Sequence, residues 1–153
     1  MRLVCLALVS FAFAYGEPKN DGFCVGGSES PCEAKSFPAS GTVVSYEELK
    51  DLLGNQKLQL FDVRNPDEFA EGYIPGATNV PLGGLEQAFG LSPSAFEQRY
   101  GTPLPMKDDS DIVLYCQRGR RSATALEIVH ALGFSKARHY FGGYGEWKRL
   151  EAA

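Results

Sequence analysis

One strand–helix segment constrains the fold of this chain more than any other part of its sequence. An uninterrupted apolar run at residues 112–115 indicates a buried strand, and it ends at Cys116. A basic, glycine-containing loop follows, and an amphipathic helix is predicted over residues 122–132. A strand that is apolar on both faces and leads into a helix is typical of a parallel sheet covered by helices.

The rest of the chain repeats this alternation of strand and helix patterns. Further strands are predicted at residues 42–44, 58–64, 78–80 and 137–141. Further helices are predicted at residues 45–53 and 66–69, in two pieces between 83 and 100, and after 142–143. A capping-box pattern at Ser45 and Glu48 indicates where the first of these helices begins. We therefore predict one α/β domain over residues 41–153, with a parallel sheet and helices on both of its faces.

The first forty residues differ in composition from this domain. Residues 1–16 carry a charge at Arg2, an apolar run and an Ala-x-Ala sequence, which resembles a secretory signal peptide. The run is too short to span a bilayer, so we expect no membrane contact in the mature form. The alternatives are a loosely attached extension or an alternative start. Residues 17–40 are rich in Gly, Ser, Pro and Asn and predict a flexible linker.

Net charge and cysteine content reduce the number of function classes that fit this chain. The chain of 153 residues has a net charge of −4, which argues against nucleic-acid binding because that needs a broadly basic face. No C-x-x-C pair accompanies the two histidines, so we predict neither a structural metal site nor another cofactor. If the chain enters the secretory pathway, Cys24 and Cys32 could form a disulfide; otherwise they remain free thiols.

Cys116 has a different setting, because it lies at the carboxyl end of a strand and before a helix. Sheets of this kind bind ligands at their carboxyl edge, and helix N-termini bind anions. Such a position favours the thiolate, the reactive form of cysteine. We therefore expect Cys116 to be a nucleophile that faces a small anion. Its substrate-binding loop is predicted to comprise Gln117, Arg118, Gly119, Arg120, Arg121 and Ser122.

Roles within this loop follow from residue type. Backbone N–H groups of residues 117–122 can form a nest for the bound anion, and Gly119 permits the tight curl. We expect Arg121 to order the loop, whereas Arg118 and Arg120 face the anion. A solvated charged turn is the alternative for Arg118 or Arg120 taken singly, and a buried structural thiol is the alternative for Cys116.

Several separated motifs, in this order, resemble the rhodanese-like sulfurtransferases. They are Leu60-Phe61-Asp62-Val63-Arg64, Asp67-Glu68-Phe69, Ile74-Pro75-Gly76-Ala77 with Asn79 and Pro81, Cys116 with Gly119, Arg121 and Ser122, Leu132-Gly133-Phe134, and Tyr144-Gly145-Glu146-Trp147. The loop's start and the last motif are most similar to the small single-domain branch that transfers sulfur from thiosulfate to glutathione. The resemblance implies a five-stranded parallel sheet, a persulfide on Cys116, thiosulfate as donor, and glutathione or a protein thiol as acceptor.

The resemblance also implies supporting residues. It places Asp62 and Arg64 beside the site and Trp147 near the pocket mouth, although an ion pair and core packing are the simpler interpretations. Tyr73 stands where many members have histidine. We expect His130 to lie on the surface, and the sequence indicates no partner for His139.

Three other functions remain as alternatives. Cysteine phosphatases, including the cell-cycle dual-specificity enzymes that share this fold, carry the phosphate-binding arginine at the position that Ser122 occupies here, so this loop is one residue shorter. A rhodanese-like domain can also be a non-catalytic binding module, usually when the cysteine is absent. A Cys–His protease is the weakest alternative. For the compartment, the leader indicates the secretory pathway, whereas the resemblance indicates cytoplasm or mitochondrion, where a reactive thiol is not exposed to oxidising conditions.

Overall fold

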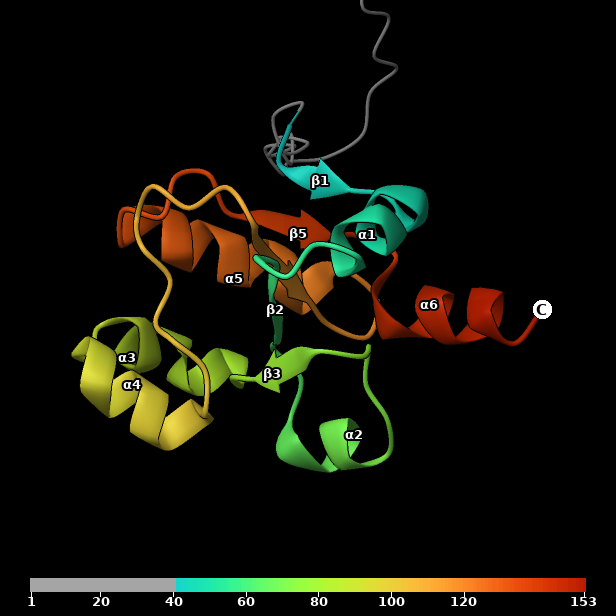
Figure 1. The fold of residues 1–153 in the computed structure, drawn as a ribbon. Coiled ribbons are helices and arrows are strands. Elements are labelled where there is room, and N and C mark those ends of the chain that lie inside the picture. The colour runs from blue at the N-terminus through green and yellow to red at the C-terminus, as the bar shows by residue number, and fades with distance from the viewer. Residues whose placement is uncertain (1–40) are drawn as a thin grey trace, which may run out of the picture. The chain divides into compact units, whose positions relative to one another are not determined.

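A five-stranded parallel sheet forms the centre of the domain. The protein is represented by a computed structural model that describes residues 41–153, so the predicted leader, the predicted linker and the Cys24–Cys32 pair lie outside the described residues. The strand order is β1-β5-β4-β2-β3, and all four pairings are parallel (Figure 1). The strands are β1 (Val43–Val44), β2 (Gln59–Asp62), β3 (Ala77–Asn79), β4 (Ile112–Tyr115) and β5 (Arg138–Tyr140).

Helices cover both faces of the sheet, as predicted. One face packs against α1 (Tyr46–Leu53) and α6 (Gly143–Glu151), which contribute Leu49 and Trp147 to its core. The other packs against α3 (Leu85–Phe89), α4 (Pro93–Tyr100) and α5 (Arg120–Ala131), whose core residues include Phe89, Phe96 and Val129. The remaining elements are the short helix α2 (Pro66–Ala70) and the 3-10 turn η1 (Leu82–Gly84).

The central strand β4 explains why the apolar run predicted a strand that is buried on both sides. All four of its residues are buried, and successive side chains point to opposite faces. Ile112 and Leu114 belong to the core beneath α3, α4 and α5. Val113 and Tyr115 belong to the core beneath α1 and α6. Cys116, the next residue, returns to the α5 side.

The predicted elements are confirmed, with shifts at their ends. The second and fifth strands are shorter than predicted, and β3 begins one residue earlier, at Ala77. The predicted start of α5 was wrong, because the helix begins at Arg120 rather than at Ser122. No side chain caps this end, since the residue before the helix is Gly119 in a left-handed conformation, so the usual cap signal is missing.

Capping chemistry accounts for the helix starts that the sequence located well. Ser45 accepts a hydrogen bond from the Glu48 backbone N–H at 3.2 Å, and Ser92 accepts one from the Ala95 N–H at 3.4 Å. The Glu48 carboxylate forms an ion pair with Arg138 on β5. The first helix is therefore joined to the strand that lies next to β1.

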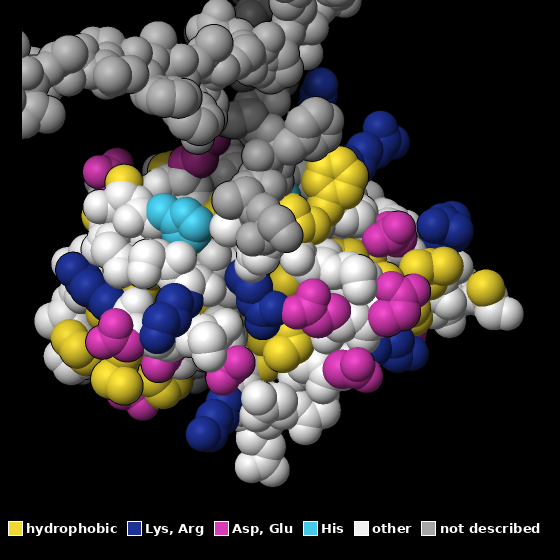
Figure 2. Space-filling view, turned by 90° about the horizontal axis from the view of Figure 1, so that it is seen from above, with side chains coloured by type: hydrophobic (Ala, Val, Ile, Leu, Met, Phe, Trp, Pro, Cys, Tyr) yellow, Lys and Arg dark blue, Asp and Glu magenta, His cyan; other side chains and the backbone are white. Residues whose placement is uncertain are grey.

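The surface carries charges of both signs. Figure 2 shows acidic and basic side chains interspersed on the face viewed from above, with hydrophobic side chains scattered between them. Within residues 41–153, no helix has the length and apolar character needed to cross a membrane.

Candidate active site

Cys116 lies at the carboxyl end of the central strand. It directly follows β4, and its side chain is almost completely covered, with a relative exposure of 1%. Its sulfur lies 3.7 Å from the hydroxyl oxygen of Ser122, in the first turn of α5. The predicted arrangement of strand end, cysteine and helix start is therefore present in the fold.

The turn between β4 and α5 depends on Gly119. This residue has a φ of +77°, a backbone conformation that favours glycine. A Cβ atom at this position would also collide with the backbone carbonyl of Phe141, which follows β5. The turn spans only residues 117–119, so Arg120, Arg121 and Ser122 belong to the first helical turn rather than to a loop. The first backbone N–H groups of such a helix have no intrahelical acceptor and can bind an anion.

Arg121 extends sideways from this turn to α2. Its guanidinium donates two hydrogen bonds to the Glu68 carboxylate, at 2.6 and 2.7 Å, in a bidentate ion pair. The same carboxylate accepts a bond from the Asn65 backbone N–H at 3.2 Å. The Arg121 guanidinium, followed by the Asn65 N–H, lowers the pKa of Glu68 to about 2. Arg121 therefore ties the start of α5 to α2.

Replacing Glu68 with glutamine (Glu68→Gln) should weaken this tie. We expect the free energy of unfolding to fall by about 0.5–1 kcal/mol, the usual contribution of a partly exposed ion pair. Because the pKa of Glu68 is depressed when folded, its stabilisation is complete above pH 4.5 and is lost as the pH falls from about 4.5 towards about 2. Urea unfolding at several pH values should show this pH-dependent loss in the wild type and a smaller one in the variant.

An exposed glutamate on α5 provides the matched control for that experiment. Glu127 forms no ion pair with any residue in the described part of the chain, so Glu127→Gln should leave the pH dependence as in the wild type. An equal loss of stability in both variants would contradict a specific contribution from the Glu68–Arg121 pair.

The other two arginines after Cys116 are Arg118 in the turn and Arg120 at the start of α5. Arg118 and Arg120 are exposed, and neither forms an ion pair with another residue between 41 and 153. Their charges therefore stand beside the helix start without a carboxylate to neutralise them.

A buried ion pair supports the turn from the β2 side. Asp62, at the end of β2, and Arg64 have relative exposures of 0% and 2%, and Arg64 Nη2 lies 2.6 Å from Asp62 Oδ2. Arg64 also donates from Nη1 to Gln117 Oε1 at 3.3 Å and from Nη2 to the Gly72 carbonyl at 2.7 Å. One face of its guanidinium lies over the Tyr144 ring, 4.3 Å from the centroid. The pair thus holds Gln117, the first residue of the turn.

Helix α6 holds the turn from the opposite side. The Tyr144 N–H donates to the Cys116 carbonyl at 2.8 Å, and the Gly145 N–H donates to the Gln117 carbonyl at 3.2 Å. Gly143 permits this approach, because a Cβ there would lie only 2.5 Å from the Cys116 carbonyl oxygen, and its φ is +66°. The backbone around Cys116 is therefore fixed on both sides.

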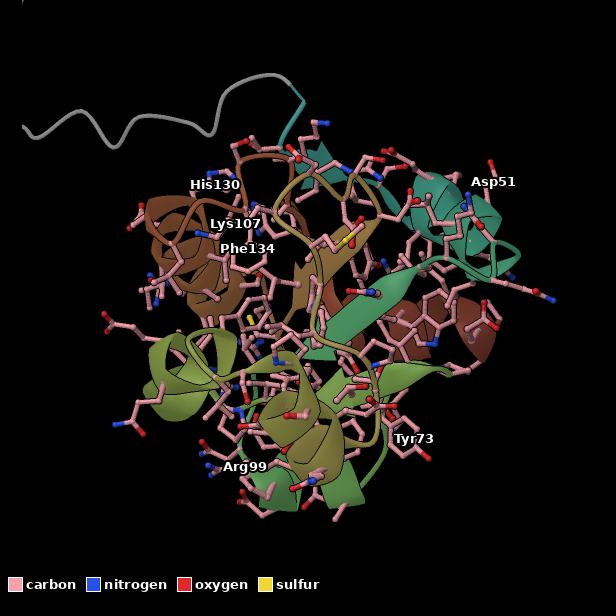
Figure 3. All side chains as sticks on the ribbon, turned by 60° about the vertical axis from the view of Figure 1, so that its left-hand side comes forward. Asp51, Tyr73, Arg99, Lys107, His130 and Phe134 are labelled. Carbon is pink, nitrogen blue, oxygen red and sulfur yellow. The ribbon has the colours of Figure 1, made fainter. Side chains whose placement is uncertain are left out.

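Trp147 lies on α6, and Tyr73 follows α2. Trp147 is buried in the core beneath α1 and α6, where its ring lies 5.5 Å from that of Tyr46. The structure therefore shows Trp147 packing in the core. Tyr73 is 49% exposed, stacks on Phe69 and points away from the domain (Figure 3).

The two histidines differ in position. His130 lies near Lys107 and Phe134 at one end of α5 (Figure 3) and bonds through Nε2 with the Ala137 carbonyl at 2.9 Å. It is partly exposed, which is in keeping with the predicted surface position. His139 is buried on β5, and its Nδ1 lies 3.2 Å from the Ser122 hydroxyl. Among residues 41–153, no group of His, Cys, Asp and Glu side chains could hold a metal ion.

Sequence reasoning assigned no role to Glu68, Gly143 or His139. Glu68 lies in the Asp67-Glu68-Phe69 motif, but its partner Arg121 is 53 positions away in the sequence. The Gly142-Gly143 pair indicated a turn, and only the fold shows that it leaves room for the Cys116 carbonyl. The contact of His139 with Ser122 depends on β5 lying beside β4.

Comparison with known proteins identifies the family of this chain. The rhodanese-like domain family matches residues 45–150. The chain belongs to the rhodanese-like sulfurtransferase family. It is 40% identical over 114 residues to human thiosulfate:glutathione sulfurtransferase, a match that covers 74% of this chain and 99% of that protein. It is also 40% identical over 102 residues to a putative mitochondrial thiosulfate sulfurtransferase of Schizosaccharomyces pombe, covering 67% of this chain and 71% of that protein.

Solved rhodanese-like structures share the fold. A human single-domain sulfurtransferase superposes with a TM-score of 0.68 and 41% identity, covering 71% of this chain and 96% of that one. A Saccharomyces cerevisiae protein superposes with a TM-score of 0.60 and 31% identity, covering 74% and 96%. The predicted five-stranded parallel sheet with helices on both faces is thus confirmed as a rhodanese-like fold.

Proposed function

We propose that Cys116 takes up the outer sulfur of thiosulfate as a persulfide and passes it to a thiol acceptor, of which glutathione is the best supported. The observation that carries this proposal is the position of the Cys116 sulfur, at the end of β4 and beside the first turn of α5. Two exposed arginines, Arg118 and Arg120, lie in the segment that joins these elements and have no ion-pair partner among residues 41–153. This position suits a thiolate that reacts with a small dianion.

The reaction has two balanced steps. The Cys116 thiolate attacks the outer sulfur of thiosulfate, a new S–S bond forms, and the old S–S bond breaks as sulfite leaves with its electron pair. The thiolate of the acceptor then attacks the outer sulfur of the persulfide. This step forms the acceptor persulfide and returns Cys116 to its thiolate, so no external oxidant or reductant is needed.

The chain's own residues would bind and orient the sulfur. Arg118 and Arg120 attract the dianion, because their charges have no partner within the described domain. The first backbone N–H groups of α5, which have no intrahelical acceptor, hold the transferred sulfur as an anion. Arg64 fixes Gln117, and Arg121 fixes the helix start through Glu68, so both act on the shape of the turn.

The relatives support this choice of substrates. The human protein that is 40% identical over 114 residues is named for transfer from thiosulfate to glutathione, and the match covers 99% of its length. A phosphatase is less well supported, because the Arg121 guanidinium is bonded to Glu68, and Ser122 stands where a phosphatase carries its phosphate-binding arginine.

Mass spectrometry after incubation with thiosulfate tests the proposal directly. The Cys116 peptide should gain one sulfur atom, and added glutathione should remove it. A parallel assay with p-nitrophenyl phosphate should show no turnover. Hydrolysis of that ester without a mass gain would replace the proposal with a phosphatase, and neither activity would leave a non-catalytic binding module.

A further inference from the structure

A buried histidine lies behind the cysteine, linked to it through one hydroxyl group. His139 is on β5 and has a relative exposure of 1%. Its Nδ1 is 3.2 Å from Ser122 Oγ, and the same oxygen is 3.7 Å from Cys116 Sγ. Burial lowers the pKa of His139 below its ordinary value of 6.5, so the ring is neutral at neutral pH.

The hydrogen bonds of Ser122 decide which ring nitrogen carries the proton. Its single hydroxyl hydrogen is donated to the Gly119 carbonyl, at 3.0 Å. Ser122 Oγ must then accept from His139, so Nδ1 carries the hydrogen and Nε2 is an acceptor. Nε2 has no partner within residues 41–153, and the other tautomer would bury an unpaired N–H there.

We propose that His139 is a positioning residue that acts through Ser122 to stabilise the thiolate of Cys116. In the thiol form, Cys116 donates to Ser122 Oγ. When the thiol proton has left to solvent, the Ser122 hydroxyl turns from the Gly119 carbonyl to the sulfur and donates a hydrogen bond to the anion. His139 keeps its Nδ1 hydrogen and continues to donate it to Ser122 Oγ, which holds that oxygen in place and polarises its O–H bond.

This role differs from that of a general base. His139 neither receives the thiol proton nor changes its charge, so it affects the reaction only through the position and polarity of the Ser122 hydroxyl. The importance of this thiolate for sulfur transfer rests on the proposed function. The stabilisation of the thiolate does not, because it can be measured without any sulfur donor.

Other ionisable groups lie around the cysteine and remain unchanged in the experiment. They are Arg121 and Arg120 on α5, Arg118 in the turn, Asp62 on β2, Arg64 after it, Tyr115 on β4, Tyr140 on β5 and Tyr144 on α6. The pKa values of the buried Tyr115 and Tyr140 hydroxyls are raised, chiefly by burial, so these groups remain neutral through the range in which a thiol ionises.

The test compares His139→Leu with His139→Asn in the full chain. The ionisation of Cys116 is followed by the ultraviolet absorbance of its thiolate across pH, with Cys116→Ser in each background subtracted to remove tyrosine and the other cysteines. In His139→Leu the midpoint should rise by roughly one pH unit, the equivalent of one lost hydrogen bond. In His139→Asn the side-chain amide can still donate to Ser122, so the midpoint should stay near that of the wild type.

Three outcomes would overturn the proposal. One is an unchanged midpoint in His139→Leu, and another is an equal shift in both variants, which would mean that a donor at this position is irrelevant. The third is an unchanged midpoint in Ser122→Ala, a variant that also serves if His139→Leu fails to fold. Ser122→Ala should raise the midpoint by an amount similar to that of His139→Leu, and His139→Leu added to Ser122→Ala should have no additional effect. If the midpoints shift as expected but thiosulfate never loads Cys116, the proposed function fails and this inference stands.

Discussion

We expect the replacement of Cys116 with serine (Cys116→Ser) to lower the rate of sulfur transfer from thiosulfate by at least roughly a thousandfold. A serine hydroxyl does not ionise at neutral pH and cannot form a persulfide, so no intermediate can be loaded. The change is small in volume, and the new hydroxyl lies near Ser122, where it can find a hydrogen bond. We therefore expect a folded domain, with a loss of only about 1–2 kcal/mol in the free energy of unfolding.

The cysteines of the predicted linker provide the matched controls for this experiment. Cys24→Ser and Cys32→Ser make the same chemical change outside the described domain and should keep wild-type turnover. Activity is measured as sulfite release from thiosulfate in the presence of glutathione, and folding is followed by thermal unfolding. Sulfite release by Cys116→Ser at the wild-type rate would contradict the assignment of the nucleophile.

The largest expected effect on stability comes from Asp62→Ala. Asp62 accepts hydrogen bonds from the backbone N–H and the side chain of Arg64, and both side chains are buried. Removing the carboxylate leaves a buried guanidinium without its counterion, which costs about 3–5 kcal/mol. Because domains of this size are stable by only about 5–15 kcal/mol, the variant should unfold at a much lower denaturant concentration.

Two further substitutions provide reference values for the loss in the free energy of unfolding expected for Asp62→Ala. Asp108→Ala removes an exposed carboxylate and should cost less than about 0.5 kcal/mol. Asp62→Asn keeps one side-chain oxygen as an acceptor but removes the charge, so its loss should lie between those of the two alanine variants. A loss below about 1 kcal/mol for Asp62→Ala would show that the ion pair does not stabilise the fold as its burial implies.

The fold was predictable because buried parallel strands produce a signal that is local in sequence. The run from Ile112 to Tyr115 is apolar at every position, and the structure places alternate side chains in two different cores. The beginning of α5 was not predictable in the same way. Gly119 precedes it in place of a capping side chain, and charged residues such as Arg120 and Arg121 are equally compatible with a turn or with a first helical turn.

The partners of the site residues were harder to predict, because they depend on contacts between distant segments. Three arginines in one short turn look alike in sequence, yet Arg121 bonds to Glu68, whereas Arg118 and Arg120 remain unpaired within the described residues. His139 had no identifiable partner in the sequence, since its contact with Ser122 exists only when β5 lies beside β4. Sequence patterns thus located the cysteine and its turn, and the tertiary structure assigned the neighbours.

The strand order also sets the sequence in which the domain can assemble as it is translated. Among residues 41–153, β1 pairs with β5 alone, although β1 is the first of the five described strands to leave the ribosome and β5 is the last of them. Cys116 likewise emerges before the residues of β5 and α6 that pack around its turn. A nascent chain therefore carries an uncovered thiol until β5 and α6 have been made, and oxidation of cysteine follows its exposure.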